Sequence, residues 1–312
     1  HAQVTTPFLI DHHSFIYLDR GAEKYGDVTS TGGTVTHSEA TSEIVLSTTT
    51  SSGSLASRQT HQYYPYTPGI GTEVVMSLRT GIEDQSGTVS RWGMFDDNDG
   101  LFFEVSGSLV SIGTKSKVSG TVVTTKVPQS DWNGNRLENA VINTYALDVS
   151  KYNLYWIDFA WLGVNRIRFG TYAPGGSKLV LHTIKNVNVL LAPYSRRGTL
   201  PLRFEQYNET AVGAPNQLKL VCASVQQQTE TPYQGKTFSA ASNSVGVSGS
   251  SVPLISLRPK TTIGSKDNRI TYFATHYEYI VSGDPVIIES IVQSTSDRTD
   301  RYRCNFFYGW FY

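Results

Sequence analysis

The sequence predicts an all-β protein centred on a jelly-roll or lectin-like antiparallel β-sandwich. From about residue 55, stretches rich in Val, Ile, Thr and aromatic residues recur at the regular spacing of sandwich strands, with turn residues between them. No window longer than about ten residues combines a 3.6-residue apolar period with helix caps, so we expect almost no helix beyond one short turn near residues 135–140. Only 17% of the residues are charged. Ser, Thr, Asn, Gln and Gly supply the remaining polarity, which suits turns and strand faces.

The charge balance argues against partners that attract a protein through a long-range field. The 312 residues include 26 Lys and Arg and 26 Asp and Glu, a formal net charge of zero. We therefore expect neither nucleic acid nor a membrane as a partner. No run of about 18 apolar residues indicates a transmembrane helix. A neutral surface does little to oppose self-association, which favours a subunit of an assembly.

The sequence shows no sign of a cofactor. The two cysteines, Cys222 and Cys304, leave one disulfide and two free thiols equally open. No C-x-x-C pair indicates a zinc site, and no phosphate loop or dinucleotide fingerprint occurs, so we expect no cofactor. Because the chain begins with His1 and not Met, we expect a mature or partial chain.

Three regions are expected along the chain. Residues 1–55, rich in Ser, Thr and Gly, are predicted to form an N-terminal arm with edge strands. Residues 56–210 are predicted to form the sandwich, including a hairpin that turns at residues 98–100, where Asn-Asp-Gly tolerates positive φ. Residues 211–312 are predicted to form a smaller β region. Its last segment, Phe306–Tyr312, has six aromatic residues in seven and should pack on this chain or on a neighbour.

The segment YWIDFAWLGVNRIRFG, residues 155–170, is predicted to be a pair of strands that holds the two sheets together. We expect its large apolar side chains to form the structural core between the sheets. These anchors are Trp156, Phe159, Trp161 and Phe169. Asp158 is expected to pair with Arg166 or Arg168 on the neighbouring strand, and a cross-strand ion pair of this kind helps to fix the register.

Two groups of acidic residues are candidates for sites of chemistry. Glu104 and Asp158 would suit the acid and base of a glycoside hydrolase, but the compact E-x-D-x-x-E spacing of laminarinase-type glycosidases is absent, so the structural role of Asp158 is favoured. Asp96, Asp97 and Asp99 offer oxygen ligands for calcium. No Glu follows at the distance that a calcium loop requires, so a hairpin turn is favoured and no metal is expected.

Exposed aromatic side chains could bind a glycan by stacking on the sugar ring. Trp132 and Tyr152 are the candidates for such a platform. In strands, however, Trp and Tyr more often fill a core or a subunit interface, and this second interpretation is favoured.

Several segments taken together resemble a family of virion structural proteins found in marine tailed phages and in large DNA viruses of algae. The similarity covers about residues 56–270. Asn165, Leu200 and Asp99 depart from the family pattern, all at turns or strand starts. The segments that carry the resemblance are RQTHQYYPYTPG, RWGMFDDNDGLFFEV, VPQSDWNGNRLE, YWIDFAWLGVNRIRFG, LPLRFEQYN and PLISLRPKTTIGSKDNR.

The resemblance implies a lectin-like sandwich that serves as a component of the virion and carries no assigned catalytic residue. The expected partners are other copies of the chain and other virion proteins, in a capsid decoration, minor capsid, fibre or tail-associated role. Two alternatives stay open. One is a carbohydrate-binding module or receptor-binding fibre domain that contacts a host glycan, and the other is a glycoside hydrolase of lectin-like fold.

Overall fold

The computed structural model describes residues 8–16, 19, 21–81, 85–138 and 145–228, together with the backbone of five short strands beyond them. The chain divides into two units, His1–Tyr233 and Gln234–Tyr312. The expectation that the aromatic end of the chain packs on a surface lies outside the described side chains. The strands of the second unit are β16 (Ser256–Leu257), β17 (Thr262–Ile263), β18 (Lys266–Asp267), β19 (Glu289–Ser294) and β20 (Tyr302–Phe307).

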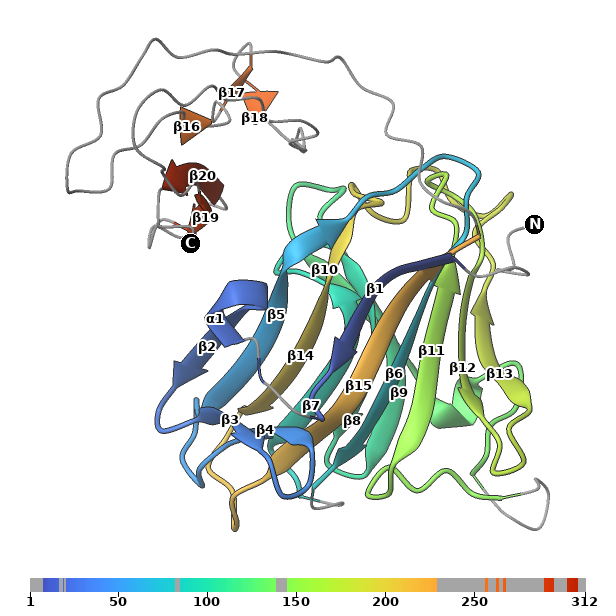
Figure 1. Ribbon diagram of the computed structural model, residues 1–312. Helices are drawn as coiled ribbons and strands as arrows, with labels where there is room; N and C mark the ends of the chain where they lie inside the picture. Colours follow the sequence, from blue (N-terminus) through green and yellow to red (C-terminus); the bar gives the residue numbers. More distant parts are fainter. Residues whose placement is uncertain are drawn as a thin grey trace, which may run out of the picture. The chain divides into compact units, whose positions relative to one another are not determined.

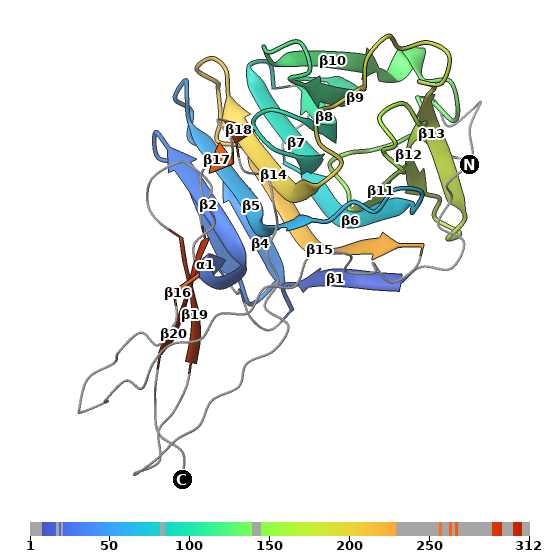
Figure 2. The ribbon, with the colours of Figure 1, turned by 90° about the horizontal axis from the view of Figure 1, so that it is seen from above.

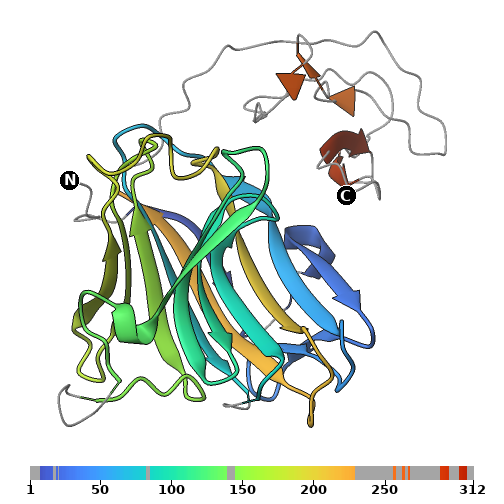
Figure 3. The same cartoon turned by 180° about the vertical axis from the view of Figure 1, so that it is seen from behind.

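The first unit is a sandwich of two antiparallel sheets, shown from opposite sides in Figures 1 and 3. Sheet A contains, in order, β13 (Lys178–Ile184), β12 (Ile167–Tyr172), β11 (Asn153–Phe159), β6 (Thr72–Thr80), β15 (Gln217–Gln227), β4 (Glu43–Ser47) and β3 (Thr34–Ser38), and β1 (Phe8–Ser14) also pairs with β15. Sheet B contains, in order, β10 (Val123–Pro128), β9 (Leu109–Ser116), β8 (Gly100–Ser106), β7 (Thr88–Phe95), β14 (Leu200–Asn208), β5 (Leu55–Tyr64) and β2 (Tyr25–Ser30).

This architecture confirms the predicted all-β, lectin-like sandwich. The helical content of the described residues is one four-residue turn, α1 (Gly21–Lys24), and one 3₁₀ turn, η1 (Gln129–Asp131). The 3₁₀ turn lies a few residues before the short turn expected near 135–140. No helix in the described part of the chain is long and apolar enough to cross a membrane.

The division of the chain in the structure falls after Tyr233 and not at the predicted boundaries, residues 55 and 210. Strands β1 to β4, placed in an arm by the prediction, all belong to the two sheets. Strand β15 lies near the middle of sheet A, where it pairs with β6 on one side and with β4 and β1 on the other. The physical reason is burial, because Leu218, Leu220 and Val225 of β15 are at most 1% exposed and fill the core.

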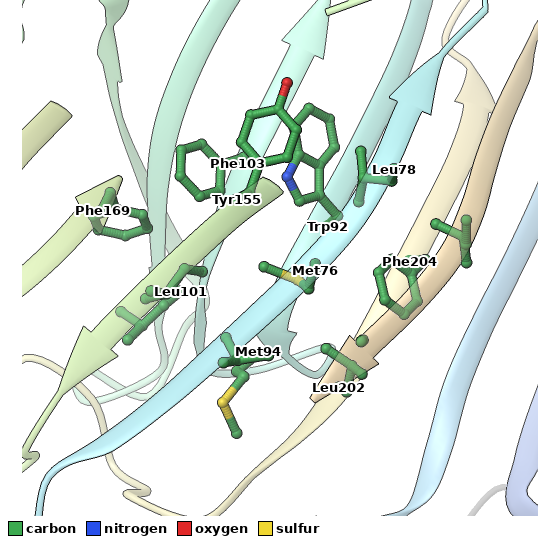
Figure 4. Packing of buried hydrophobic residues seen from close by; sticks show 14 of the residues in the cluster. Met76, Leu78, Trp92, Met94, Leu101, Phe103, Tyr155, Phe169, Leu202 and Phe204 are labelled. Carbon is green, nitrogen blue, oxygen red and sulfur yellow. The ribbon is translucent and has the colours of Figure 1, made fainter. Parts of the chain in front are cut away.

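The core lies between the sheets and is rich in aromatic rings (Figure 4). Trp92 of sheet B stacks on Phe103 with ring centroids 5.9 Å apart, and it also contacts Tyr155 of sheet A at 4.9 Å. Phe169 meets Phe103 edge-on at 5.4 Å. Phe159 belongs to the same cluster, so Phe159 and Phe169 lie in the core between the sheets.

Trp156 and Trp161 differ from the predicted anchors. Trp156 is fully buried, yet it lies on the outer face of sheet A, because Tyr155 and Ile157 on either side of it point into the core. Trp161 is only partly buried at the margin of the core. Its indole nitrogen donates to Ser195 Oγ at 2.9 Å, and its ring meets Tyr66 edge-on at 5.4 Å.

The segment after η1 connects β10 of sheet B with β13 of sheet A through hydrogen bonds. Trp132 is 1% exposed and donates its indole N–H to the carbonyl of Val127 at 3.2 Å. The backbone N–H groups of Gly134 and Asn135 then donate to carbonyls of β13 at 3.0 and 2.9 Å. A Cβ on Gly134 would come 2.5 Å from the carbonyl oxygen of Val180, so this close approach requires glycine.

Candidate functional site

The outer face of sheet A carries the predicted register ion pair. Asp158 on β11 lies opposite Arg168 on β12, and the two side chains form an ion pair. Asp158 is 1% exposed. Arg166 makes no ion pair within the described residues, although its charge helps to favour the ionised carboxylate. The pairing therefore involves Arg168 and not Arg166.

Glu73 adds a second acid to this face, and no sequence motif singles it out. It lies on β6 directly opposite Asp158 and forms an ion pair with Lys178 of β13. Burial raises the pKa of both carboxyls, and the proximity of Asp158 raises that of Glu73 further. Two buried acids and two more exposed bases thus form one charge-balanced group. An acid inside an ordinary strand pattern gives no signal of its own in the sequence, and only the pairing of β6 with β11 brings it here.

Trp156 forms the floor beside this charged group. Its ring lies against Gly170, where an added Cβ would come 2.1 Å from the ring atoms. The Nζ atom of Lys178 is 4.3 Å from the ring centroid, and the guanidinium carbon of Arg168 is 5.7 Å away. Both contacts are of cation–π type. The indole is therefore enclosed by its own chain and presents no open face to a sugar.

The outer face of sheet B carries a ladder of alternating charges. Glu104, Arg91 and Glu205 are neighbours across β8, β7 and β14. Glu104 forms ion pairs with Arg91 Nε and Lys126 Nζ, each at 2.5 Å. The Arg91 guanidinium also lies 3.8 Å from the Glu205 carboxylate. Arg203 forms a further ion pair with Glu205. Every acid of the ladder is thus paired with a base.

Glu104 and Asp158 cannot act as one acid and base pair. Glu104 alternates with Phe103 and Val105, which face the core, so its carboxylate points out of sheet B. Asp158 points out of sheet A for the same reason. The two carboxylates lie on opposite faces of the sandwich, so one glycosidic bond cannot lie between them.

The three aspartates of the β7–β8 hairpin are paired with arginines. Asp96 also accepts the backbone N–H groups of Asn98 and Asp99 at 2.7 and 2.8 Å, which shapes the turn. No cluster of three His, Cys, Asp or Glu side chains suited to a metal occurs in the described residues. The aspartates hold the hairpin against β14 and the segment that leads into it. The pairs are Asp96–Arg197, Asp97–Arg203 and Asp99–Arg196.

The two aromatic residues considered for glycan binding do not share a platform. Trp132 is buried in the core. Tyr152 is 43% exposed, donates its hydroxyl to Glu43, and has the guanidinium of Arg79 over its ring at 5.5 Å. Only Tyr152 is therefore available at the surface.

A buried histidine links the two sheets. His13 of β1 in sheet A hydrogen-bonds through Nδ1 to the hydroxyl of Tyr25 at 2.5 Å and through Nε2 to that of Tyr64 at 2.9 Å. Both tyrosines belong to sheet B. Burial lowers the pKa of His13 to about 4, so the imidazole is neutral near neutral pH. His12 and His13 face opposite sides of β1, as their adjacency predicts, and His13 serves the fold.

Comparison with known proteins adds the following findings. No family model and no curated protein matches the chain. A β-1,3-glucanase from Mycobacterium marinum is similar in structure, with 14% identity, a TM-score of 0.47, and coverage of 70% of this chain and 98% of its own. An endo-β-1,4-glucuronan lyase from Trichoderma reesei has 11% identity, a TM-score of 0.46 and coverage of 70% and 95%. The carbohydrate recognition domain of Emp47p has 12% identity, a TM-score of 0.43 and coverage of 69% and 93%. At these identities and TM-scores, function has to be argued from the chain's own residues.

Proposed function

We propose that this chain is a structural subunit of a virion and acts by assembling with its own copies and with other virion proteins. The observation that carries the proposal is the pairing of the acidic side chains. On both outer faces and in the β7–β8 hairpin, the acids that are candidates for catalysis or calcium binding each form an ion pair with Arg or Lys. Such side chains maintain a framework, whereas a catalytic pair needs a carboxylate that is open to substrate.

The segments that resemble virion proteins also contact one another. The hydroxyl of Tyr66 accepts the backbone N–H of Leu162 at 2.9 Å, which joins two of these segments. In a third segment, the side chain of Asn133 bonds both backbone groups of Thr183 in β13, which lies outside these segments, with its oxygen accepting the N–H at 2.9 Å. These residues therefore support the framework, as expected for a motif that specifies a fold.

The proposal is tested by locating the chain in purified particles. Mass spectrometry of virions from the native source should detect the protein at a stoichiometry that survives repeated density banding. Electron microscopy of the recombinant chain should show ordered oligomers. Absence from washed particles, with the protein found free in the lysate, would overturn the proposal.

Carbohydrate binding is a second candidate, and a polar row on the outer face of sheet B favours it. Arg203 donates to Gln59 Oε1 at 3.3 Å, and Gln59 Nε2 donates to the hydroxyl of Tyr63 at 3.5 Å. Guanidinium, amide and phenol groups are well suited to bind sugar hydroxyls. Binding on a glycan array that is lost in Gln59→Ala, while a Tyr152→Ala variant still binds, would support this function.

A further inference from the structure

Among the described strands, β10 is the last of sheet B at one end. It pairs with β9 on one side and is the terminal strand of the sheet on the other. Figure 2 shows β10 at one end of the row of sheet B strands and β2 at the other. The first four residues of β10 are exposed, and Val123 and the preceding Val122 are 51% and 42% exposed. A terminal strand of this kind presents backbone donors and acceptors to any strand that approaches.

Two other edges of the sandwich, β13 and β2, have features that oppose strand addition. The edge of β13 is covered, because the backbone of Gly134 and Asn135 already bonds to its carbonyls. Strand β2 carries Asp27, held by Arg58 at 2.6 Å, and edge charges are a common protection. The described part of β10 is made of Val and Thr apart from Lys126 and Pro128, and Lys126 is directed to Glu104 on the face of the sheet.

We propose that the edge of β10 pairs with β10 of a second copy of this chain, antiparallel and across a two-fold axis. The inference rests on the proposed function and names the contact between subunits. An antiparallel pairing centred on Thr124 sets this residue opposite itself in the second copy, and sets Val123 opposite Thr125. Lys126 then faces Val122, so no like charges are opposed. The pairing is isologous and closes, as a two-fold contact requires.

The net charge supports a second copy as the partner. The formal charge of zero produces no long-range repulsion between copies. Strand addition supplies main-chain hydrogen bonds without needing a groove. The pairing would join two sheets B into one continuous sheet, which suits a building block of a shell or fibre.

Sedimentation velocity of the full chain, with a matched pair of variants, tests this contact. Val123→Lys places a charge on the β10 edge and should weaken dimerisation at least tenfold. Val28→Lys makes the same change on β2 at the other end of the sheet, where the valine is 49% exposed, and should leave the dimer unchanged. Equal thermal unfolding of both variants shows that the fold is retained.

Hydrogen exchange gives a second measurement that does not depend on a variant. The amides of residues 122–126 should become more protected as the protein concentration rises through the dimer range, whereas those of β2 should not. A wild-type chain that stays monomeric, or a dimer indifferent to Val123→Lys, overturns the inference. Protection of β10 that appears only with another virion protein also overturns it in favour of that partner. Each of these results leaves the virion role intact, since particle mass spectrometry tests that role separately.

Discussion

Asp158 and Glu73 lie directly opposite each other on β11 and β6, with exposures of 1% and 5%, and each is paired with a different cation. Two buried acids side by side repel each other unless each has a base. Arg168 and Lys178 come from the next two strands in the sheet. The arrangement therefore couples the register of four strands to a single charge balance.

Removing one member of this group of two acids and two bases should lower the free energy of unfolding. Asp158→Ala leaves Arg168 without its partner at a largely buried site, and we expect the free energy of unfolding to fall by about 3–5 kcal/mol. Asp97→Ala is the matched control, because Asp97 also pairs with an arginine but its side chain is 84% exposed; its cost should be at most about 1 kcal/mol. Urea denaturation measures both. Equal costs would contradict the structural role of Asp158.

The same residue separates the structural reading from the glycoside hydrolase alternative. Asp158→Asn keeps the shape of the side chain but removes its charge, so we expect lower stability and no catalytic loss. Reducing-sugar release from algal polysaccharides is the assay. An activity present in the wild type, and abolished in Asp158→Asn at unchanged stability, would establish the hydrolase instead.

A glycine beneath Trp156 should tolerate no side chain. Gly170→Ala would place a Cβ 2.1 Å from the indole ring, and overpacking of this kind costs about 1–3 kcal/mol. Gly175→Ala is the control, because nothing lies within 4 Å of the added carbon there. The midpoint of thermal unfolding should fall for Gly170→Ala and stay level or rise for Gly175→Ala.

Trp132 should behave as a core residue and not as a glycan platform. Trp132→Ala removes a side chain that is 1% exposed, and we expect a loss of about 3–5 kcal/mol in the free energy of unfolding. Tyr152→Ala, at a 43% exposed position, should cost far less. A Trp132→Ala variant of normal stability that had lost glycan binding would reverse this assignment.

The sequence predicted the fold class, and it limited the partner of Asp158 to Arg166 or Arg168, because both inferences depend on local alternation. Tyr155, Ile157 and Phe159 repeat every second residue, which is the signature of a strand. The same alternation sets Trp156 on the other face, but alternation alone does not tell which face is the core when both carry large aromatic residues. Glu73 was missed because it lies 85 positions before Asp158 in the chain, and only the pairing of β6 with β11 joins them. Sheet topology, and with it the place of β15, is a long-range property that no local pattern reports.

His13 should make the sandwich sensitive to acid. Its pKa falls from 6.5 in the unfolded chain to about 4 in the fold because the ring is buried. Between these values the unfolded chain binds the proton and the folded chain does not, so this contribution is fully present above pH 6.5 and is lost as the pH falls toward 4. The loss amounts to roughly 3 kcal/mol.

Asp158 and Glu73 have raised pKa values, so their contribution to stability changes with pH in the opposite direction to that of His13. The effect of His13 is therefore isolated by comparing the wild type with His13→Gln. Urea denaturation at pH 7 and pH 4.5 should show the variant losing much less stability on acidification than the wild type. Parallel pH dependence in the two proteins would show that the link between His13, Tyr25 and Tyr64 does not govern acid stability.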